Sequence, residues 1–490
     1  MRRSHPFVHL ATAPLALLVA TTFACSRNPA PATERESTPI ASPTPEEPPD
    51  TSEPDSSEPE WETASPEPTP EAEPPQAKGG GGGKTTQAAR SGTDTADPAF
   101  GVNVGFYARL LEGGGSVFRR GYRTSRYKAG DEPFDPDFLA VLEPFSVLRF
   151  HQFHHVSFSG EKEWSDRASP KKDVPLTEEQ IGDGEAVIPY EWEIRMCNAA
   201  HADYWVTVPA QASREYIRSL ARLVKKELDP GLRVWIEHSN EVWNFDYSDG
   251  AGWDPTPNRK DGQNNLAREV GLKVGAEADD MFHQAAFGYT RESLELFGAF
   301  EEVFGANSPR VVKVMAWIAP EVDPEEGSWN SLQAVFDALD SPRVTRFEGA
   351  PASTRPDVIA INPYFNYPEE SKDRWKDLEA ALERLDPSLA FTRQVVRENL
   401  GPDVKVVGYE GGQHVIWGAA KEMNRDPRMY RLYRRWMEIM REHLDLTAHY
   451  ALVTPFLEGE AFGLKESIGQ PVEQAHKWRA LMDDIEAHRR

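Results

Sequence analysis

The chain has 490 residues, of which 39% are hydrophobic, and a formal net charge of −25. It is long enough to bury a large core, and its acidity argues against nucleic acid as a partner, because phosphate binding needs a basic face. Residues 1–25 carry a charge of +2 and residues 26–97 carry −10, which leaves −17 for the rest. A neutral partner such as a sugar polymer fits this balance better than an anionic one.

The N-terminus has the layout of a secretion signal. Two arginines precede an uncharged and mostly apolar stretch, residues 10–24, which is short for a membrane-crossing helix. The following Thr22-Phe23-Ala24-Cys25 resembles the lipobox of bacterial lipoproteins, in which the cysteine is acylated. We predict a signal peptide over residues 1–24 and lipidation of Cys25, with ordinary cleavage before the cysteine or an uncleaved anchor as alternatives. By resemblance to known sorting rules, Ser26 favours the outer membrane within a cell-envelope or secreted location.

Residues 25–97 are predicted to form a disordered tether. Proline, glutamate, serine and threonine dominate, and Gly79 to Gly83 are consecutive, so the segment cannot bury enough apolar surface to offset its ordering entropy. We therefore expect one folded domain over residues 98–490. The chain has two cysteines, Cys25 and Cys197, and lipidation of the first leaves no disulfide framework. Cys197 is expected to be a buried small hydrophobe rather than a nucleophile.

From Phe100 onward, apolar strands alternate with amphipathic helices. Eight strands separated by helices predict a parallel sheet, and eight repeats favour a closed (β/α)₈ TIM barrel over a doubly wound sheet. The expected fold class is therefore α/β, with inserted loops at residues 156–189 and 244–264. The predicted strands cover residues 100–104, 145–150, 204–208, a segment starting at 232, 311–317, 358–362, 404–410 and 448–456. The predicted helices cover residues 138–142, 190–202, 214–228, 265–305, 429–443 and 472–487.

Two glutamates stand at the C-terminal ends of predicted strands, where TIM barrels carry their active sites. Glu241 follows the fourth strand and Glu410 ends the seventh. A retaining glycosidase needs one carboxyl to protonate the leaving oxygen and a second, about 5–5.5 Å away, to attack the anomeric carbon. Ionisation of one carboxyl raises the pKa of its neighbour, which separates the two roles. The structural alternatives are a capping or salt-bridge residue for Glu241 and a loop carboxylate for Glu410.

The segments around these glutamates resemble a known family. Ser239-Asn240-Glu241-Val242-Trp243-Asn244 and Tyr409-Glu410-Gly411-Gly412 are similar to clan A glycoside hydrolases, (β/α)₈ enzymes with catalytic glutamates at the ends of strands four and seven. They also look like a bacterial group often labelled as cellulose-binding proteins, over roughly residues 100–490. The resemblance implies that Glu241, preceded by asparagine, is the acid/base and that Glu410 is the nucleophile.

The same resemblance implies roles for further residues. Arg149 would hold the nucleophile ionised, unless it forms a surface ion pair. Tyr364 would hydrogen-bond the nucleophile, unless it is a packed loop residue. Asn240 would bind the sugar 2-hydroxyl or else cap the strand. Where the clan usually carries a tryptophan at the end of strand eight, this sequence has Thr454-Pro455-Phe456.

Aromatic side chains near predicted strand ends are candidates for a sugar-binding cleft, because sugars stack their apolar faces on aromatic rings. Core packing is the alternative for each of them. His414 is a further candidate, through substrate hydrogen bonding or through packing. The aromatic candidates are Trp243, Trp317, Tyr367 and Trp417.

Histidines invite a metal hypothesis that the spacing disfavours. On a strand His151 and His155 share a face but His154 does not, and no acidic residue completes a triad. We therefore expect no metal and no cofactor, and the sequence has no phosphate-binding loop and no Gly-x-Ser-x-Gly elbow. Glu237 shares the strand parity of Glu241, and either points into the barrel or forms a structural ion pair.

These observations favour a monomeric retaining β-glycosidase that acts on a polysaccharide and touches the membrane only through its lipid anchor. The second hypothesis is a non-catalytic carbohydrate-binding lipoprotein that keeps the barrel. A metal-dependent barrel hydrolase is the third.

Overall fold

The structure is a computed structural model of the chain. The predicted signal peptide and tether, Cys25, His154 and His155 lie outside the residues that it describes. The described residues are 99–105, 110–111, 116–151, 153, 156, 159–176, 188–244, 263–325, 327–368 and 370–488.

Eight parallel strands close into a barrel, which confirms the predicted α/β class and the (β/α)₈ fold. Neighbours follow one another in chain order, and the last strand pairs with the first, so every backbone edge is hydrogen-bonded. The strands are β1 (Ala99–Asn103), β2 (Val147–Phe150), β3 (Asp203–Val208), β4 (Val234–His238), β5 (Val311–Ala316), β8 (Val358–Ile361), β10 (Lys405–Gly408) and β12 (Leu446–His449).

The barrel divides the core into an inner and an outer part. Successive side chains of a strand point to opposite faces: Val312, Val314 and Ala316 of β5 belong to the inner cluster, whereas Met315 packs in the outer one. Because both faces of each strand are covered, apolar strand residues are buried on either side of the sheet, beside a smaller number of buried polar residues such as Arg149 and Glu237.

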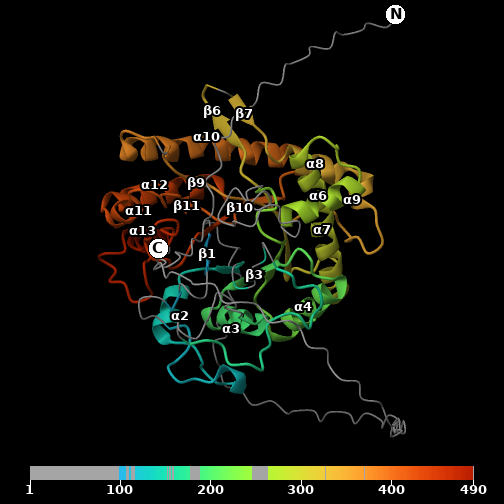
Figure 1. Cartoon of the computed structure of the whole chain (residues 1–490), viewed down its shortest axis with the longest axis horizontal. Helices are drawn as coiled ribbons and strands as arrows, with labels where there is room; N and C mark the ends of the chain where they lie inside the picture. The colour runs from blue at the N-terminus through green and yellow to red at the C-terminus, as the bar shows by residue number, and fades with distance from the viewer. Residues whose placement is uncertain are drawn as a thin grey trace, which may run out of the picture. The chain divides into compact units, whose positions relative to one another are not determined.

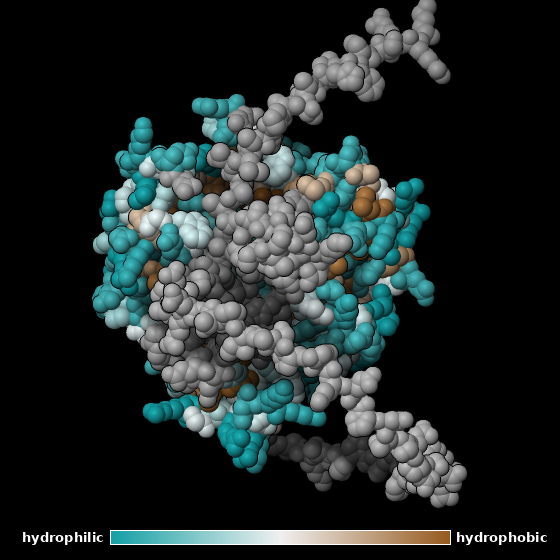
Figure 2. Space-filling view, in the orientation of Figure 1, coloured by the Kyte–Doolittle hydropathy of each residue, from teal (hydrophilic) through white to brown (hydrophobic). Residues whose placement is uncertain are grey.

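Helices lie around the strands (Figure 1). They bury one apolar face each: Ile217, Leu220 and Val224 of α4 are buried, and the side chain of Ser213 caps the first turn of that helix. On the face of the molecule that Figure 2 shows, the coloured surface is mostly hydrophilic. The helices are α2 (Pro136–Leu142), α3 (Tyr190–Ala200), α4 (Arg214–Glu227), α6 (Gln263–Lys273), α7 (Met281–Phe304), α8 (Gln333–Asp340), α9 (Pro342–Thr345), α10 (Arg374–Leu400), α11 (Ala420–Arg425), α12 (Arg428–His443) and α13 (His476–His488), with a short 3₁₀ turn at Thr124–Arg126.

The helical region predicted over residues 265–305 consists of two helices, α6 and α7. The chain turns between them near Gly275, whose φ of +93° is a conformation that glycine tolerates. The two helices approach so closely that a Cβ on Gly288 would lie 1.8 Å from the carbonyl oxygen of Ala267.

The predicted bounds of the eighth strand were wrong, since β12 spans Leu446–His449 rather than residues 448–456. The following residues are buried and apolar but bond outside the barrel ladder, for example Leu452 N to the carbonyl of Asn103 and Thr454 N to that of Lys465. An apolar run does not by itself reveal where a strand gives way to a buried loop.

Two small sheets extend the loops beyond the barrel. An antiparallel hairpin joins β6 (Glu321–Asp323) to β7 (Gly327–Trp329) after β5. The parallel pair of β9 (Tyr364–Phe365) and β11 (Gly412–Gln413) joins the segments that follow β8 and β10. Within the described residues, no helix combines the length and the apolarity that a bilayer crossing requires.

Candidate active site

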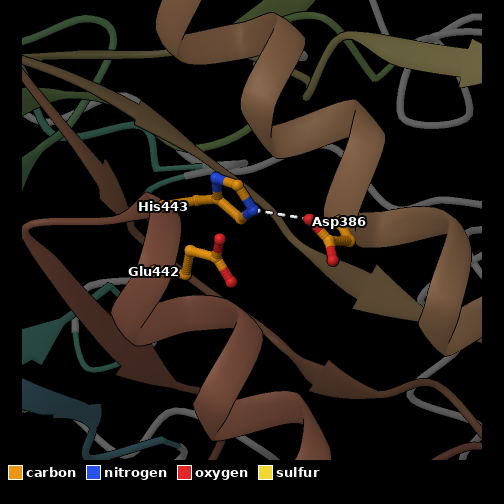
Figure 3. A group of neighbouring side chains, drawn as sticks. All are labelled: Asp386, Glu442 and His443. Atoms are coloured by element: carbon orange, nitrogen blue, oxygen red, sulfur yellow. Dashed lines mark hydrogen bonds and ion pairs between the residues drawn. The ribbon is translucent and has the colours of Figure 1, made fainter.

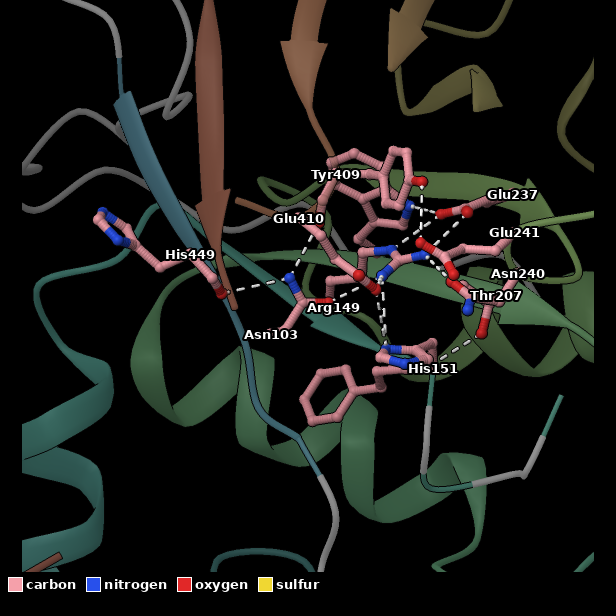
Figure 4. Close-up of polar contacts among 12 residues, drawn as sticks. Asn103, Arg149, His151, Thr207, Glu237, Asn240, Glu241, Tyr409, Glu410 and His449 are labelled. Carbon is pink, nitrogen blue, oxygen red and sulfur yellow. Dashed lines mark hydrogen bonds and ion pairs between the residues drawn. The ribbon is translucent and has the colours of Figure 1, made fainter. Parts of the chain in front are cut away.

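Arg149 of β2 lies at the centre of a polar cluster inside the barrel (Figure 4). Its side chain is fully buried, and it donates through Nε and Nη2 to the two carboxylate oxygens of Glu237, at 2.9 and 2.8 Å. Its Nη1 donates to Oε1 of Glu410 at 2.7 Å. One guanidinium therefore holds two carboxylates, one from β4 and one from the segment that follows β10.

The remaining donors of Arg149 also have acceptors. Nη1 donates to Oδ1 of Asn103 and Nη2 to Oδ1 of Asn240, both at 2.8 Å. All five N–H groups of a guanidinium are thus engaged, which is the condition under which a buried charge is tolerated. Burial alone would lower the pKa of Arg149, but Glu237 and Glu410 outweigh it and raise that pKa. Arg149 therefore stays charged.

Glu410 accepts a second hydrogen bond, from the hydroxyl of Tyr364 at 2.9 Å. The pairing of β9 with β11 places Tyr364 opposite Gly412, which stands two residues after Glu410. Burial raises the pKa of Glu410, and the charge of Arg149 with the hydrogen bonds from Arg149 and Tyr364 offsets part of that rise. The pKa of Glu410 therefore stays above its usual value, although both donors favour the ionised form.

Glu241 follows β4 in a turn with unusual backbone geometry. Ser239 and Glu241 have φ of 55° and 47°, in the left-handed region that non-glycine residues seldom adopt. The hydroxyl of Tyr409 donates to Oε1 of Glu241 at 3.3 Å, and Nδ2 of Asn244 donates to Oε2 at 3.1 Å. Glu241 is 4% exposed, so its carboxyl is held within the same buried cluster.

The two glutamates are connected through Tyr409. This residue precedes Glu410 in the chain, and its hydroxyl contacts Glu241 (Figure 4). Its backbone N donates to the carbonyl of Ile361 at 2.9 Å, and its own carbonyl accepts from Asn103 Nδ2 at 2.9 Å. The structure thus brings Glu241, Glu410, Arg149, Asn240 and Tyr364 into one continuous hydrogen-bonded group.

The predicted aromatic residues divide into two sets. Trp243 and Trp417 are partly exposed, and the indole Nε1 of Trp243 donates to the hydroxyl of Tyr409 at 3.3 Å. Trp417 and Tyr364 pack against the same buried apolar cluster, and the carbonyl of Trp417 accepts from the hydroxyl of Tyr367 at 3.4 Å. Trp317 instead is fully buried, a placement in the core rather than at a surface.

His414 lies against the ring of Tyr364, with a centroid distance of 5.3 Å. Burial lowers the pKa of His414 to about 4, so the imidazole is neutral at neutral pH. His151 is one of the three histidines that the sequence analysis considered as metal ligands. Its Nδ1 lies 3.7 Å from Oε1 of Glu410. The imidazole of His414 thus lies beside Tyr364, a partner of Glu410, and that of His151 lies near Glu410 itself.

Tyr450 is the aromatic residue that directly follows β12, which corrects the sequence interpretation that placed Phe456 at that strand end. Its ring is buried, 5.7 Å from His151 and 5.1 Å from Phe462 between centroids. Phe456 is buried in the same aromatic cluster.

Sequence reasoning did not identify Asn103 and Tyr409 as members of the site. Asn103 ends β1, where its Oδ1 accepts from Arg149 and its Nδ2 donates to the carbonyls of Tyr409 and His449. The available signal was a polar residue closing an otherwise apolar strand at the barrel end that carries active sites.

One further group of His, Asp and Glu side chains, among the described residues, is close enough to share an ion (Figure 3). It consists of Asp386 of α10 with Glu442 and His443 of α12. His443 Nε2 already contacts Oδ1 of Asp386 at 2.7 Å, and Nη2 of Arg435 lies 3.7 Å from Oδ2. These contacts account for the group as a polar link between two outer helices.

Comparison with known proteins gives structural neighbours only, since no family model and no curated protein sequence matches the chain. An α-L-arabinofuranosidase from Thermotoga maritima aligns with a TM-score of 0.45 and 14% identity, over 78% of this chain and 70% of that one. A GH51 arabinofuranosidase from Xanthomonas axonopodis pv. citri aligns at 0.43 and 12%, over 73% and 67%. A β-glucosidase from Thermotoga maritima aligns at 0.41 and 12%, over 80% and 99%. Similarity at this level carries no conclusion about activity, so the chemistry has to be argued from the side chains.

Replacing Arg149 by methionine should destabilise the fold by about 3–5 kcal/mol, because it leaves two buried carboxylates without their cation. Urea unfolding followed by circular dichroism measures the change. Arg119→Met is the matched control, since the Arg119–Glu132 pair is largely exposed and should contribute at most about 1 kcal/mol. Equal losses in the two variants would contradict the central role of Arg149.

Proposed function

We propose that the chain is a retaining glycoside hydrolase that cleaves β-glycosidic bonds of a polysaccharide. The observation that carries the proposal is the connection of two carboxyls at the C-terminal ends of strands four and seven by one residue, Tyr409. Double displacement needs two carboxyls close together, one of them ionised. The paired donors on Glu410 favour its ionised form, which suits it to be the nucleophile.

In the first step, the carboxylate of Glu410 attacks the anomeric carbon while Glu241 gives its proton to the departing glycosidic oxygen. The C–O bond to the leaving group breaks and an ester to Glu410 forms. In the second step, Glu241 takes a proton from water, whose oxygen attacks the same carbon and releases Glu410. Arg149 and Tyr364 balance the charge that Glu410 recovers, and Asn240 is suited to bind the sugar 2-hydroxyl.

The aromatic surroundings support a carbohydrate rather than a charged substrate. Trp243 and Trp417 present partly exposed rings next to the carboxyl cluster. Aromatic faces bind the apolar faces of sugar rings, and amide and imidazole groups bind their hydroxyls. A non-catalytic carbohydrate-binding protein would keep these contacts without turnover.

The decisive experiment measures hydrolysis of 2,4-dinitrophenyl β-glycosides of glucose, xylose, mannose and galactose, together with reducing-end release from cellulose, xylan and mannan. Glu410→Gly should abolish turnover, and Glu241→Gln should lower it by about 10²–10⁴-fold on substrates with a poor leaving group. Glu132→Gln, at an exposed ion pair, serves as the control.

Added azide separates the two roles, because it replaces the missing nucleophile in Glu410→Gly and attacks the glycosyl-enzyme in Glu241→Gln. The glycosyl azides should therefore have α and β configuration respectively. Wild-type rates in both variants would refute the assignment. Polysaccharide binding by the wild type without any bond cleavage would instead favour the non-catalytic function.

Tyr364→Phe should shift the acid limb of the kcat/KM profile to higher pH. The nucleophile works ionised, so activity falls as the pH drops through the pKa of Glu410, which burial already raises. Loss of a hydrogen bond to the charged form, of about 1.5 kcal/mol, raises this pKa further by about one unit. The profile of Tyr430→Phe, which removes an exposed hydroxyl bonded to Asp483, should match the wild type. An unmoved limb, or one moved to lower pH, would contradict the proposed role of Tyr364.

We also propose that the barrel is anchored to the cell envelope through acylated Cys25, as the sequence of residues 10–25 suggests. In a bacterial host fed with an alkyne-tagged palmitate, the wild-type chain and Cys197→Ser should carry the label, whereas Cys25→Ser should not. Cys197 is the matched control because it is buried in the folded domain. Label on Cys25→Ser, or none on the wild type, would exclude this anchor.

A further inference from the structure

We propose that Tyr409 is the positioning residue of Glu241, and that Trp243 orients its hydroxyl proton toward that carboxyl. The inference rests on the proposed function, in which Glu241 is the acid/base. Tyr409, which precedes the nucleophile Glu410 in the chain, would therefore set the ionisation of the other carboxyl, Glu241. The consequence is a defined pH at which Glu241 gives up its proton.

The direction of the proton follows from the neighbours of the hydroxyl. An indole N–H is a donor only, so the oxygen of Tyr409 must act as the acceptor in its 3.3 Å contact with Nε1 of Trp243. A phenol has one proton, and that proton is then free to point at Oε1 of Glu241, also 3.3 Å away. A carboxylate is an acceptor only, so the two contacts are compatible in one orientation.

The ring of Tyr409 has little freedom to leave this position. The residue is fully buried, and its backbone is held on both sides by hydrogen bonds to Ile361 and Asn103. The guanidinium carbon of Arg149 lies 5.0 Å from the ring centroid, a cation–π contact. Burial, with the charges of Glu241 and Glu410, raises the pKa of Tyr409, so the hydroxyl keeps its proton across the working pH range.

Two donors therefore converge on Glu241, the hydroxyl of Tyr409 on Oε1 and the amide of Asn244 on Oε2. Hydrogen bonds donated to a carboxyl favour its ionised form. The negative charge of Glu410 acts in the opposite direction, since like charges disfavour joint ionisation. The hydrogen bond from Tyr409 thus offsets part of the rise that the charge of Glu410 causes in the pKa of Glu241. Glu241 can then release its proton to the leaving oxygen and recover a proton from water at the same pH.

The test compares the pH dependence of kcat/KM for the full-length wild type, Tyr409→Phe and Tyr364→Phe. Phenyl β-glycosides are the probe, because their poor leaving group needs the acid. In Tyr409→Phe the basic limb should move about one unit to higher pH while the acid limb stays, since loss of the donor makes Glu241 keep its proton longer. In Tyr364→Phe the acid limb should move instead. Trp243→Phe, which keeps a ring but loses the N–H, should move the basic limb in the same direction by a smaller amount.

The matched control is Tyr204→Phe. Tyr204 is also a fully buried tyrosine whose hydroxyl donates to a glutamate, at 2.5 Å to Oε2 of Glu193, but on the outer side of the barrel. It should lose stability without moving either limb. Equal profiles for Tyr409→Phe and Tyr204→Phe, or an unmoved basic limb in Tyr409→Phe, would overturn the inference.

A second readout separates this inference from the proposed function. In protein labelled with ¹³C at the glutamate carboxyls, the signal lost in Glu241→Gln identifies Glu241, and its titration can be followed without turnover. Tyr409→Phe should shift that titration to higher pH by about one unit. If the wild type cleaves none of the glycosides, the proposed function fails, and an unshifted titration would sink the role of Tyr409 independently.

Discussion

The cluster inside the barrel depends on one buried guanidinium. Arg149 has acceptors from β1, from β4 and the turn beyond it, and from the segment after β10. These segments come together only when the sheet closes. The acceptors that offset the cost of burying the Arg149 charge are therefore assembled only in the closed barrel. Two carboxylates share this cation, which leaves an excess of negative charge. Burial is the main cause that raises the pKa of Glu410, and the negative charge of Glu237 adds to that rise.

Two tyrosine hydroxyls of the cluster, those of Tyr364 and Tyr409, donate to different carboxyls. Tyr364 donates to Glu410, which also accepts from the Arg149 cation, and Tyr409 donates to Glu241, which also accepts from the amide of Asn244. An adjacent cation favours the ionised form of a carboxyl, as Arg149 does for Glu410. The two tyrosine hydroxyls thus act on two different carboxyls of the same buried cluster.

Much of this arrangement was predictable from the sequence, and the rest was not for specific reasons. Strand periodicity and the glutamates at two strand ends are local patterns, and they predicted the barrel and the two carboxyls. The end of β12 was missed because a buried loop is as apolar as a strand. The long helix α10 was not predicted, and it contains Pro387, a residue that usually interrupts a helix. The roles of Asn103 and Tyr409 depend on which donors face which acceptors across the barrel, which no local pattern encodes.

The turn after β4 shows how local strain serves the cluster. In an extended strand, neighbouring side chains point to opposite faces, yet Asn240 and Glu241 both bond within the barrel. Left-handed backbone at Ser239 and Glu241 removes that alternation, at a cost on the order of 1–3 kcal/mol for each residue. The first turn of α6 helps to hold the strained segment, since Gln263 Nε2 donates to the carbonyl of Asn240 at 3.1 Å and Asn264 Nδ2 to that of Asn244 at 2.9 Å. Helix α6, which follows β4 in the chain, therefore helps to hold the turn that positions the carboxyl of Glu241.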